Sequence, residues 1–335
     1  MSKISTTAAM IDSYTNTAIK NYVKSHDEST YFPKEMWDEL TNEMDIFLPI
    51  LSEENHTLSS DFITFIRKIA NEFAALSAIL LTQGCYGIYS ILNFGTAEQK
   101  ELYLEKLLKG QYIGGLGFCE YKHLKGLEDL ETYATKTEQG WCLSGKKAMI
   151  SNSSVADILL VLAKVKEQGK VEKYGLFIVD PKDSDVLIGE QIEKPGLIGL
   201  PLSSVTLKNV LLPENALLGD ELAGDVQFAN IIKNMQLGLS AIALGVAEGA
   251  FNKGIEFAKV KRGFGKRLID VEIHQNKFAD LYNKLCSAEA YFDSYPSQIE
   301  EDAKFVSRIK LYTTKVAIEI SDEILRLIGP LQKFD

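Results

Sequence analysis

The chain has 335 residues, of which 46% are hydrophobic and 24% are charged, and these ordinary globular values argue against disorder or a fibrous repeat. Its 46 acidic and 36 basic side chains give a net charge of -10, which argues against nucleic-acid binding because such a surface repels a phosphate backbone. No uninterrupted apolar run reaches the roughly 20 residues that span a bilayer, and Met1–Tyr14 is polar without a cleavage signal. We therefore expect a folded cytoplasmic protein of two or three domains with no membrane partner.

The first third of the chain has the apolar period of helices. From about Thr7 to Leu108, apolar residues recur at intervals of three and four, and β-branched alternation is rare. Thr96 is followed three residues later by Gln99, which predicts a capping box that opens a helix to Leu108. We expect an all-helical N-terminal domain over residues 1–112.

The middle of the chain changes to short runs bounded by Gly, Ser, Asn and Pro. These runs are Thr132–Thr137, Trp141–Leu143, Ile158–Lys164, Tyr174–Val179 and Ser204–Leu207. Their length and spacing predict an antiparallel sheet domain over residues 113–222. The run Ile158–Ala163 is apolar at every position, so it predicts a central strand buried on both faces.

The helical period returns after Gly224 and holds from Phe228 to the end of the chain. The strong breaks within it are Gly263–Gly265 and Tyr295–Pro296. This pattern predicts a C-terminal helical domain over residues 223–335. The order of the chain is therefore helices, strands, helices.

The cysteines give no sign of a metal site or a disulfide framework. The four are far apart, without a Cys-x-x-Cys pair and without a histidine at zinc-ligand spacing: Cys85, Cys119, Cys142 and Cys286. We expect no bound metal.

Four separated segments resemble stretches of one enzyme family in the same order. They are Phe32–Leu40 near the start, Phe94–Lys100 before the sheet domain, Ser144–Asn152 within it, and Gly196–Gly219 at its end. Together they are similar to the acyl-CoA dehydrogenase family, and the resemblance runs as far as Gly329. It implies an α+β, acyl-CoA dehydrogenase-like fold with an N-terminal helical domain, a middle antiparallel β domain and a C-terminal helical bundle.

The resemblance implies an FAD-dependent oxidoreductase that acts on an acyl thioester, carried either by coenzyme A or by an acyl carrier protein. Family members usually assemble as homodimers or homotetramers through the third domain. Five apolar residues of its first long helix are candidates for that contact, although a role in the core of the chain is the stronger interpretation: Leu237, Leu239, Ile242, Leu244 and Val246.

Four residues of the middle domain are implied to contact the flavin. Phe118 and Cys119 stand in the segment where relatives place a hydrogen-bonding threonine, and a thiol is a weaker donor than a hydroxyl. Met149 takes the place of an aromatic wall of the ring, and Ser151 is the candidate hydroxyl donor. A hairpin whose serine caps a turn explains the same residues without a cofactor.

Four residues of the third domain are implied to contact the flavin of a neighbouring subunit or the flavin of the same chain. Lys261 and Phe264 belong to a glycine-flanked basic turn suited to a pyrophosphate, and Gln275 follows it. Gly329 stands where the family has a glycine-rich turn that contacts the flavin. The alternative for the basic turn is a plain solvated loop, and His274 is assigned no chemistry.

Two residues are implied to face the thioester, Lys125 and Met235. Relatives supply the carboxylate base for α-proton removal from one of two places. One place aligns with Met235, and the other lies beyond Gly329–Pro330, where this sequence stops at Asp335. We expect neither base, and Glu248 or a carboxylate of the sheet domain is the substitute to consider.

The segment Tyr121–Leu124 also departs from the family, because bulky residues stand where relatives have small flexible ones. We expect these side chains to fill or reshape the space beside the flavin. The alternative function is therefore a catalytically impaired or non-catalytic relative that acts as a subunit or interaction partner, with a hetero-oligomer that includes a full-length relative as one form. A flavin enzyme of altered chemistry, such as an oxygenase, is a third hypothesis.

Overall fold

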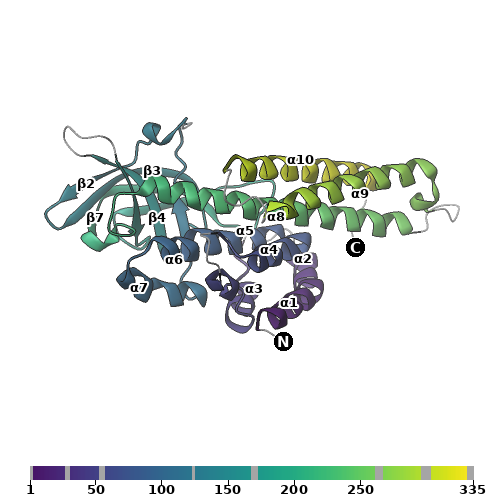
Figure 1. The fold of residues 1–335 in the computed structure, drawn as a ribbon, viewed down its shortest axis with the longest axis horizontal. Helices are drawn as coiled ribbons and strands as arrows, with labels where there is room; N and C mark the ends of the chain where they lie inside the picture. Colours follow the sequence, from purple (N-terminus) through teal and green to yellow (C-terminus); the bar gives the residue numbers. More distant parts are fainter. Residues whose placement is uncertain are drawn as a thin grey trace.

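The computed structural model describes residues 3–26, 31–52, 57–122, 125–166, 173–260, 267–295 and 303–329. It confirms the predicted order of helices, strands and helices. Figure 1 shows an elongated molecule with the sheet at one end, the N-terminal helices beneath the middle, and three long helices running to the other end.

The helices and strands have the following bounds. The N-terminal helices are α1 Lys3–Tyr14, α2 Lys20–His26, α3 Lys34–Asp38, α4 Ser60–Glu72, α5 Ala74–Thr82, α6 Ser90–Phe94 and α7 Ala97–Leu108. The strands are β1 Gly114–Gly117, β2 Tyr133–Thr137, β3 Gly140–Ser151, β4 Ile158–Lys166, β5 Lys173–Val179, β6 Val186–Gln191 and β7 Leu202–Pro213. The C-terminal helices are α8 Gly224–Lys259, α9 Glu272–Asp293 and α10 Ala303–Ile328.

The predicted capping box is confirmed at the start of α7. The Thr96 hydroxyl accepts from the Gln99 backbone N–H, and the Gln99 side chain accepts from the Thr96 backbone N–H. The Gln99 amide also donates to the carbonyl oxygens of Asn215 and Leu217, at 2.8 and 2.7 Å. One capping residue therefore joins the N-terminal helices to the end of the sheet.

A continuous helical stretch from α5 to α6 forms the centre of the N-terminal core. The π-helical turn Gln83–Tyr89 interrupts it, and every residue of that turn is buried. Among the described residues, Ala74–Phe94 is one stretch long and apolar enough, by length and composition, to cross a bilayer. Because 94% of its most apolar window is buried inside the structure, its composition is explained by its central place in the core.

The sheet has seven strands and is mostly antiparallel. Strand β4 pairs in parallel with both β1 and β2, and in antiparallel fashion with β5. The two parallel pairs differ from a purely antiparallel prediction. They arise because the chain returns to β4 after the β2–β3 hairpin, so that β4 runs beside strands from earlier in the sequence.

The prediction of a central strand at residues 158–163 is confirmed. Leu159, Leu160, Val161, Leu162 and Ala163 are all fully buried. Strand β4 has neighbours on both edges and apolar contacts on both faces, so alternation of polar and apolar residues is absent from its sequence.

Helix α8 connects the sheet to the far end of the molecule (Figure 1). The five apolar residues considered for a subunit contact belong mainly to the core of the chain, which was the stronger of the two interpretations. Leu237, Ile242 and Leu244 are buried, and Leu239 is exposed. These three buried residues are therefore wrong as candidates for a subunit contact.

Candidate functional site

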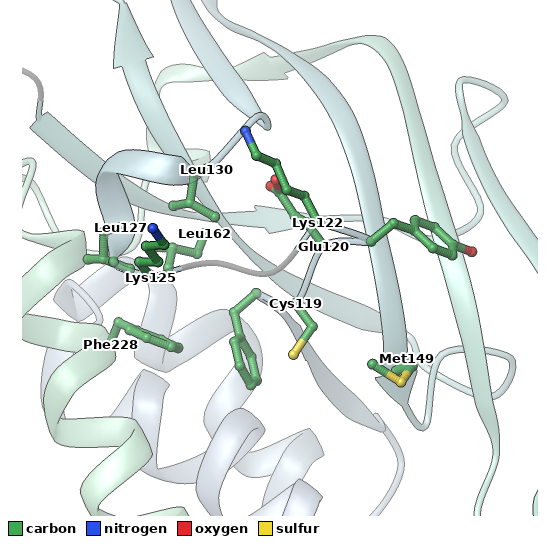
Figure 2. A pocket seen from close by; sticks show the side chains of 12 residues that line it. Cys119, Glu120, Lys122, Lys125, Leu127, Leu130, Met149, Leu162 and Phe228 are labelled. Carbon is green, nitrogen blue, oxygen red and sulfur yellow. The ribbon is translucent and has the colours of Figure 1, made fainter.

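A cavity of about 690 Å³ opens between the end of β1, the bulge of β3 and the start of α8. Twelve residues line it: Phe118, Cys119, Glu120, Tyr121, Lys122, Lys125, Gly126, Leu127, Leu130, Met149, Leu162 and Phe228. Figure 2 shows Cys119 and Met149 on one side of the cavity, with Lys125, Leu127 and Phe228 on the other. The volume lies within the usual range of cofactor and ligand pockets.

A β-bulge turns Met149 toward the cavity. Lys147 pairs with Val205 and Ile150 with Ser203, so two residues of β3 lie opposite one residue of β7. Within the bulge, Met149 has a φ of 52° and its side chain is 56% exposed. The Ala148 N–H donates to the Cys119 carbonyl oxygen at 2.8 Å. This bond holds the two flavin-candidate segments side by side.

The carboxylate of Glu120 closes the loop that forms one wall of the cavity. It accepts hydrogen bonds from the backbone N–H groups of Glu131 and Thr132, at 2.7 and 3.0 Å. Glu120 and Glu131 are therefore drawn together, and described residues between them line the cavity. Leu127 and Leu130 of that segment supply apolar lining.

The bulky residues Tyr121 and Lys122 do not fill the cavity. Tyr121 is 67% exposed, the Lys122 side chain is 61% exposed, and both lie at the rim. Lys146 lies over the Tyr121 ring, 4.7 Å from its centroid, and holds it outward. Of the two expected outcomes, Tyr121 and Lys122 do not fill the cavity but line its rim. His123 and Leu124 lie outside the described residues.

A buried ion pair supports the loop from below. The Lys147 ammonium lies 2.8 Å from Glu120 Oε1 and 3.4 Å from the Phe118 carbonyl oxygen. The two side chains are 0% and 3% exposed, respectively. Such a pair loses its hydration, so its geometry and its extra hydrogen bonds decide whether it is tolerated. Both polar contacts of the Lys147 ammonium link β3 to the cavity wall.

The ion pair shifts the pKa values of its members. Burial alone would raise the pKa of Glu120, but the hydrogen bonds from Lys147, Thr132 and Glu131 outweigh burial and hold that pKa below its ordinary value. Burial lowers the pKa of Lys147 from 10.5 to about 8, against the opposing effect of Glu120. Burial raises the pKa of the Cys119 thiol, which Lys147 partly offsets. Cys119 is therefore a neutral thiol at pH 7.

The pKa of Lys147 predicts a pH-dependent stability difference. Because the folded chain releases this proton near pH 8 and the unfolded chain near pH 10.5, the unfolded state binds more protons between these values. We expect the unfolding free energy of the wild type, relative to Lys147→Met, to rise by up to roughly 3 kcal/mol from pH 8 to 10.5. Urea denaturation of both proteins across this range measures the difference. A constant or falling difference would contradict the prediction.

The opposite wall of the cavity is aromatic and aliphatic. The rings of Phe118 and Phe228 have their centroids 5.1 Å apart, which joins the end of β1 to the first turns of α8. Leu162, from the central strand β4, supplies the floor. The interior therefore suits a flat or aliphatic group, and charge is confined to the rim and to the Glu120–Lys147 pair.

The structure gathers four of the predicted site residues: Phe118, Cys119, Lys125 and Met149 line the same cavity. Ser151 and Met235 are not among its lining residues; Met235 is 7% exposed, within the main core.

Two of the predicted residues of the third domain, Gln275 and Gly329, are described and are not among the lining residues of this cavity. Gln275 is exposed on α9 and donates to the Ile269 carbonyl oxygen, and Gly329 follows α10. Lys261 and Phe264 lie outside the described residues. Their proposed contact with a flavin, including that of a neighbouring subunit, stays a prediction.

The described lining of the cavity contains one carboxylate, Glu120, and three hydrogen-bond donors hold it. It is not available to take a proton from a substrate. Glu248, the other candidate base, lies 3.5 Å from Arg67 in a separate groove between α1, α4 and α8. The described lining of the cavity thus offers shape and polarity for a ligand, but its one carboxylate is not a free base.

Sequence reasoning missed Lys147 and Phe228. A lysine within a β-rich segment is ordinarily a solvated residue, and only the bulge and the partner at Glu120 reveal its burial. Phe228 stands at the start of a helical period that looks like ordinary core. No sequence signal places either residue at the cavity.

Three family models match the chain in succession. Residues 4–111 match the acyl-CoA dehydrogenase N-terminal domain, residues 115–210 the middle domain, and residues 226–331 the C-terminal domain. Their order is that of the helical, sheet and helical parts of the structure.

Curated relatives include both reductases and dehydrogenases. The 3-(aryl)acrylate reductase of Clostridium sporogenes is 27% identical over 80% of this chain and 72% of its own length. The mitochondrial long-chain specific acyl-CoA dehydrogenase of Mus musculus is 26% identical over 71% of this chain and only 57% of its own length. The caffeyl-CoA reductase-Etf complex subunit CarC of Acetobacterium woodii is 26% identical over 90% and 81%.

Solved structures share the fold. Butyryl-CoA dehydrogenase from Megasphaera elsdenii superimposes with a TM-score of 0.88 at 23% identity, over 98% of this chain and 88% of that one. A glutaryl-CoA dehydrogenase from Mycobacterium smegmatis, in complex with FADH2, superimposes with a TM-score of 0.86 at 22% identity, over 98% and 85%.

Proposed function

This chain belongs to the acyl-CoA dehydrogenase family of oxidoreductases, and from that premise we propose that it binds FAD in the cavity and acts on an acyl thioester. The observation that carries the proposal is the hydrogen bond that holds the Met149 side of the cavity to the segment after β1. The Ala148 N–H donates to the Cys119 carbonyl oxygen, so Met149 stays beside Cys119, while Phe118 and Phe228 form the aromatic wall. These walls suit a flat ring system, because one is a polarizable thioether and the other is aromatic.

Bound FAD would supply two-electron chemistry, as hydride exchange with the β-carbon of the thioester. The residues of the chain supply binding and orientation. Met149 and Phe118 would lie against the ring, and Cys119 would offer a weak S–H donor. Lys122 and Lys125 at the rim attract the phosphate groups of coenzyme A or of a phosphopantetheine.

The apolar wall formed by Leu127, Leu130 and Phe228 is proposed to hold the acyl group. Both directions of electron transfer are consistent with the relatives, whose names include a long-chain dehydrogenase and a caffeyl-CoA reductase. The direction used by this chain depends on its redox partner and on the source of the α-proton.

A second candidate function is supported by the state of Glu120. The one carboxylate in the described lining is buried and fully bonded, so a chain that binds flavin or thioester without turning it over is consistent with the site. Such a protein would act as a subunit beside a catalytically complete relative.

The visible absorption spectrum of the purified chain, with added FAD and after removal of unbound FAD, tests the proposal. Retained flavin bands that bleach anaerobically with an acyl-CoA, or reduced flavin that reoxidises with an enoyl-CoA, support the oxidoreductase. Retained bands that neither substrate changes support the binding subunit. A chain that holds no flavin overturns the cofactor proposal for this cavity.

Replacing Cys119 with threonine is expected to tighten FAD binding about fivefold. A hydroxyl is a stronger donor than a thiol, and a typical hydrogen bond contributes about 1 kcal/mol net. Flavin fluorescence quenching measures the dissociation constant. Cys142→Thr, on β3 outside the cavity lining, is the matched control, and an equal change in both variants contradicts a contact at Cys119.

A further inference from the structure

An exposed aromatic ring lies at the rim of the cavity. Tyr121 is 67% exposed, and the Lys146 ammonium lies 4.7 Å from its ring centroid. Tyr121 and Lys122 occupy a segment in which the family has small flexible residues. Because the Tyr121 ring neither fills the cavity nor joins the core, its large apolar surface is available to a partner molecule.

The solvent face of the sheet continues this rim. Lys146 on β3 pairs with Thr206 on β7, and Thr206 pairs with Leu187 on the edge strand β6. Directly paired residues of antiparallel strands have their side chains on the same face. Lys146 is exposed and Leu187 is 43% exposed, whereas Val205, on the other face of β7, is fully buried. Tyr121 therefore borders a sheet surface that offers a cation and an apolar side chain.

Opposite charges balance at the rim, within the described part of the chain. Lys122 lies 3.7 Å from Glu131, with the two side chains 61% and 68% exposed. Such an exposed pair contributes little energy and exchanges partners readily. Three lysines and three carboxylates belong to this region: Lys122, Lys125, Lys146, Glu128, Asp129 and Glu131. The rim is therefore a surface of mixed charge and not a cationic site.

The two carriers of an acyl thioester bring different groups to this rim. Coenzyme A brings a pyrophosphate and a ribose phosphate, and a rim of balanced charge gives such a polyanion little attraction. A carrier protein brings the single phosphodiester of its phosphopantetheine arm, followed by its own folded surface. An exposed tyrosine within a polar, mixed-charge border is typical of a protein interface. The composition of the rim therefore favours the carrier protein.

We propose, as an inference that rests on the proposed thioester chemistry, that the substrate reaches the cavity on the arm of a carrier protein that docks on Tyr121, Lys146 and Leu187. The phosphodiester of the arm passes Lys122, which Figure 2 shows extending away from Met149. In Figure 1 the sheet lies at one end of the molecule, and α9 and α10 lie toward the other. The docking surface is thus separate from the C-terminal helices.

Calorimetric titration of the full chain with unacylated holo carriers tests docking without flavin or turnover. The probes are an acyl carrier protein and a peptidyl carrier domain, and we expect at least one to bind in the micromolar range. Tyr121→Ala raises the dissociation constant about tenfold, as loss of an aromatic anchor does. Lys146→Glu raises it about fivefold at low salt and less at high salt.

Matched controls use residues of the N-terminal domain. Tyr31→Ala removes a tyrosine that is 80% exposed before α3, and Lys24→Glu reverses an exposed charge on α2. Neither control changes the affinity for the carrier. Circular dichroism of each variant confirms that the fold is retained.

One acyl group, attached in turn to the carrier, to coenzyme A and to pantetheine, tests the choice of carrier on the flavin-loaded chain. We expect the carrier thioester to bind at least about tenfold more tightly than the pantetheine thioester, because the arm and the docking surface act together. The coenzyme A thioester gains less than about threefold over pantetheine. Tyr121→Ala lowers the carrier-to-pantetheine ratio of affinities about tenfold.

The outcomes separate this inference from the proposed function. If neither holo carrier binds while acyl-CoA bleaches the flavin, the docking inference is overturned and the oxidoreductase stands. A coenzyme A thioester that binds as tightly as the carrier thioester overturns the inference as well, and so does equal weakening by Tyr121→Ala and Tyr31→Ala. A chain that holds no flavin but binds a carrier through Tyr121 loses the proposed function and keeps the docking surface.

Discussion

Replacing Lys147 with methionine is expected to lower the free energy of unfolding by about 3–5 kcal/mol, the usual cost of removing one partner from a buried ion pair. Glu120 would keep its two backbone donors but lose the ammonium 2.8 Å away. The Phe118 carbonyl would lose the same contact. Denaturation in urea at pH 7 measures the loss. Lys146→Met is the matched control, since its side chain is exposed, and it should change stability by less than about 0.5 kcal/mol.

The double variant Glu120→Gln with Lys147→Met tests how much of the stability loss comes from leaving the Glu120 charge buried without its partner. A neutral amide no longer leaves a buried charge unpaired, so this variant should recover part of the stability lost in Lys147→Met. The cavity wall depends on the same contacts. FAD affinity should therefore be highest in the wild type, lower in the double variant and lowest in Lys147→Met. Equal stability of Lys147→Met and Lys146→Met would mean that the pair does not hold the wall.

Replacing Phe228 with alanine is expected to shift thioester preference toward bulky aryl or branched acyl groups by on the order of 10–100-fold in kcat/KM or, for a binding protein, in affinity. The aromatic ring faces Phe118 with centroids 5.1 Å apart and narrows the apolar half of the cavity. Its removal leaves space that a larger acyl group can fill. A panel of acyl-CoA esters of increasing size, titrated against the flavin spectrum, measures the shift.

Phe251→Ala is the matched control for this substitution. Phe251 lies on the same helix but is buried in the C-terminal bundle, with its ring 6.0 Å from that of Phe278. Both variants should lose stability, because each removes an aromatic side chain from a packed site. Only Phe228→Ala should change acyl selectivity. A selectivity profile that is the same in both variants would place the acyl group outside this cavity.

The sequence by itself determined the order of the elements and much of their placement. Thr96 and Gln99 predict the start of α7 because a capping box depends on residues three apart, which the sequence records directly. The apolar run Ile158–Ala163 predicts a fully buried strand because a strand with both faces covered has no polar alternation, and this too is visible in the local sequence. Segment resemblance also led to Phe118, Cys119, Lys125 and Met149, which the fold brings to one cavity.

Only the tertiary structure decided how that cavity is held and what fills it. Glu120 and Lys147 are 27 residues apart and read as solvated charges, and their burial depends on a bulge in β3. Tyr121 and Lys122 have the bulk to fill the cavity, but their direction depends on contacts from neighbouring segments. Helix α10 buries Ile320 and Ile324 in the C-terminal bundle but leaves Ile318 exposed, although all three are equally apolar in the sequence. A local pattern fixes which face of an element is apolar, whereas the burial of that face depends on elements distant in the chain.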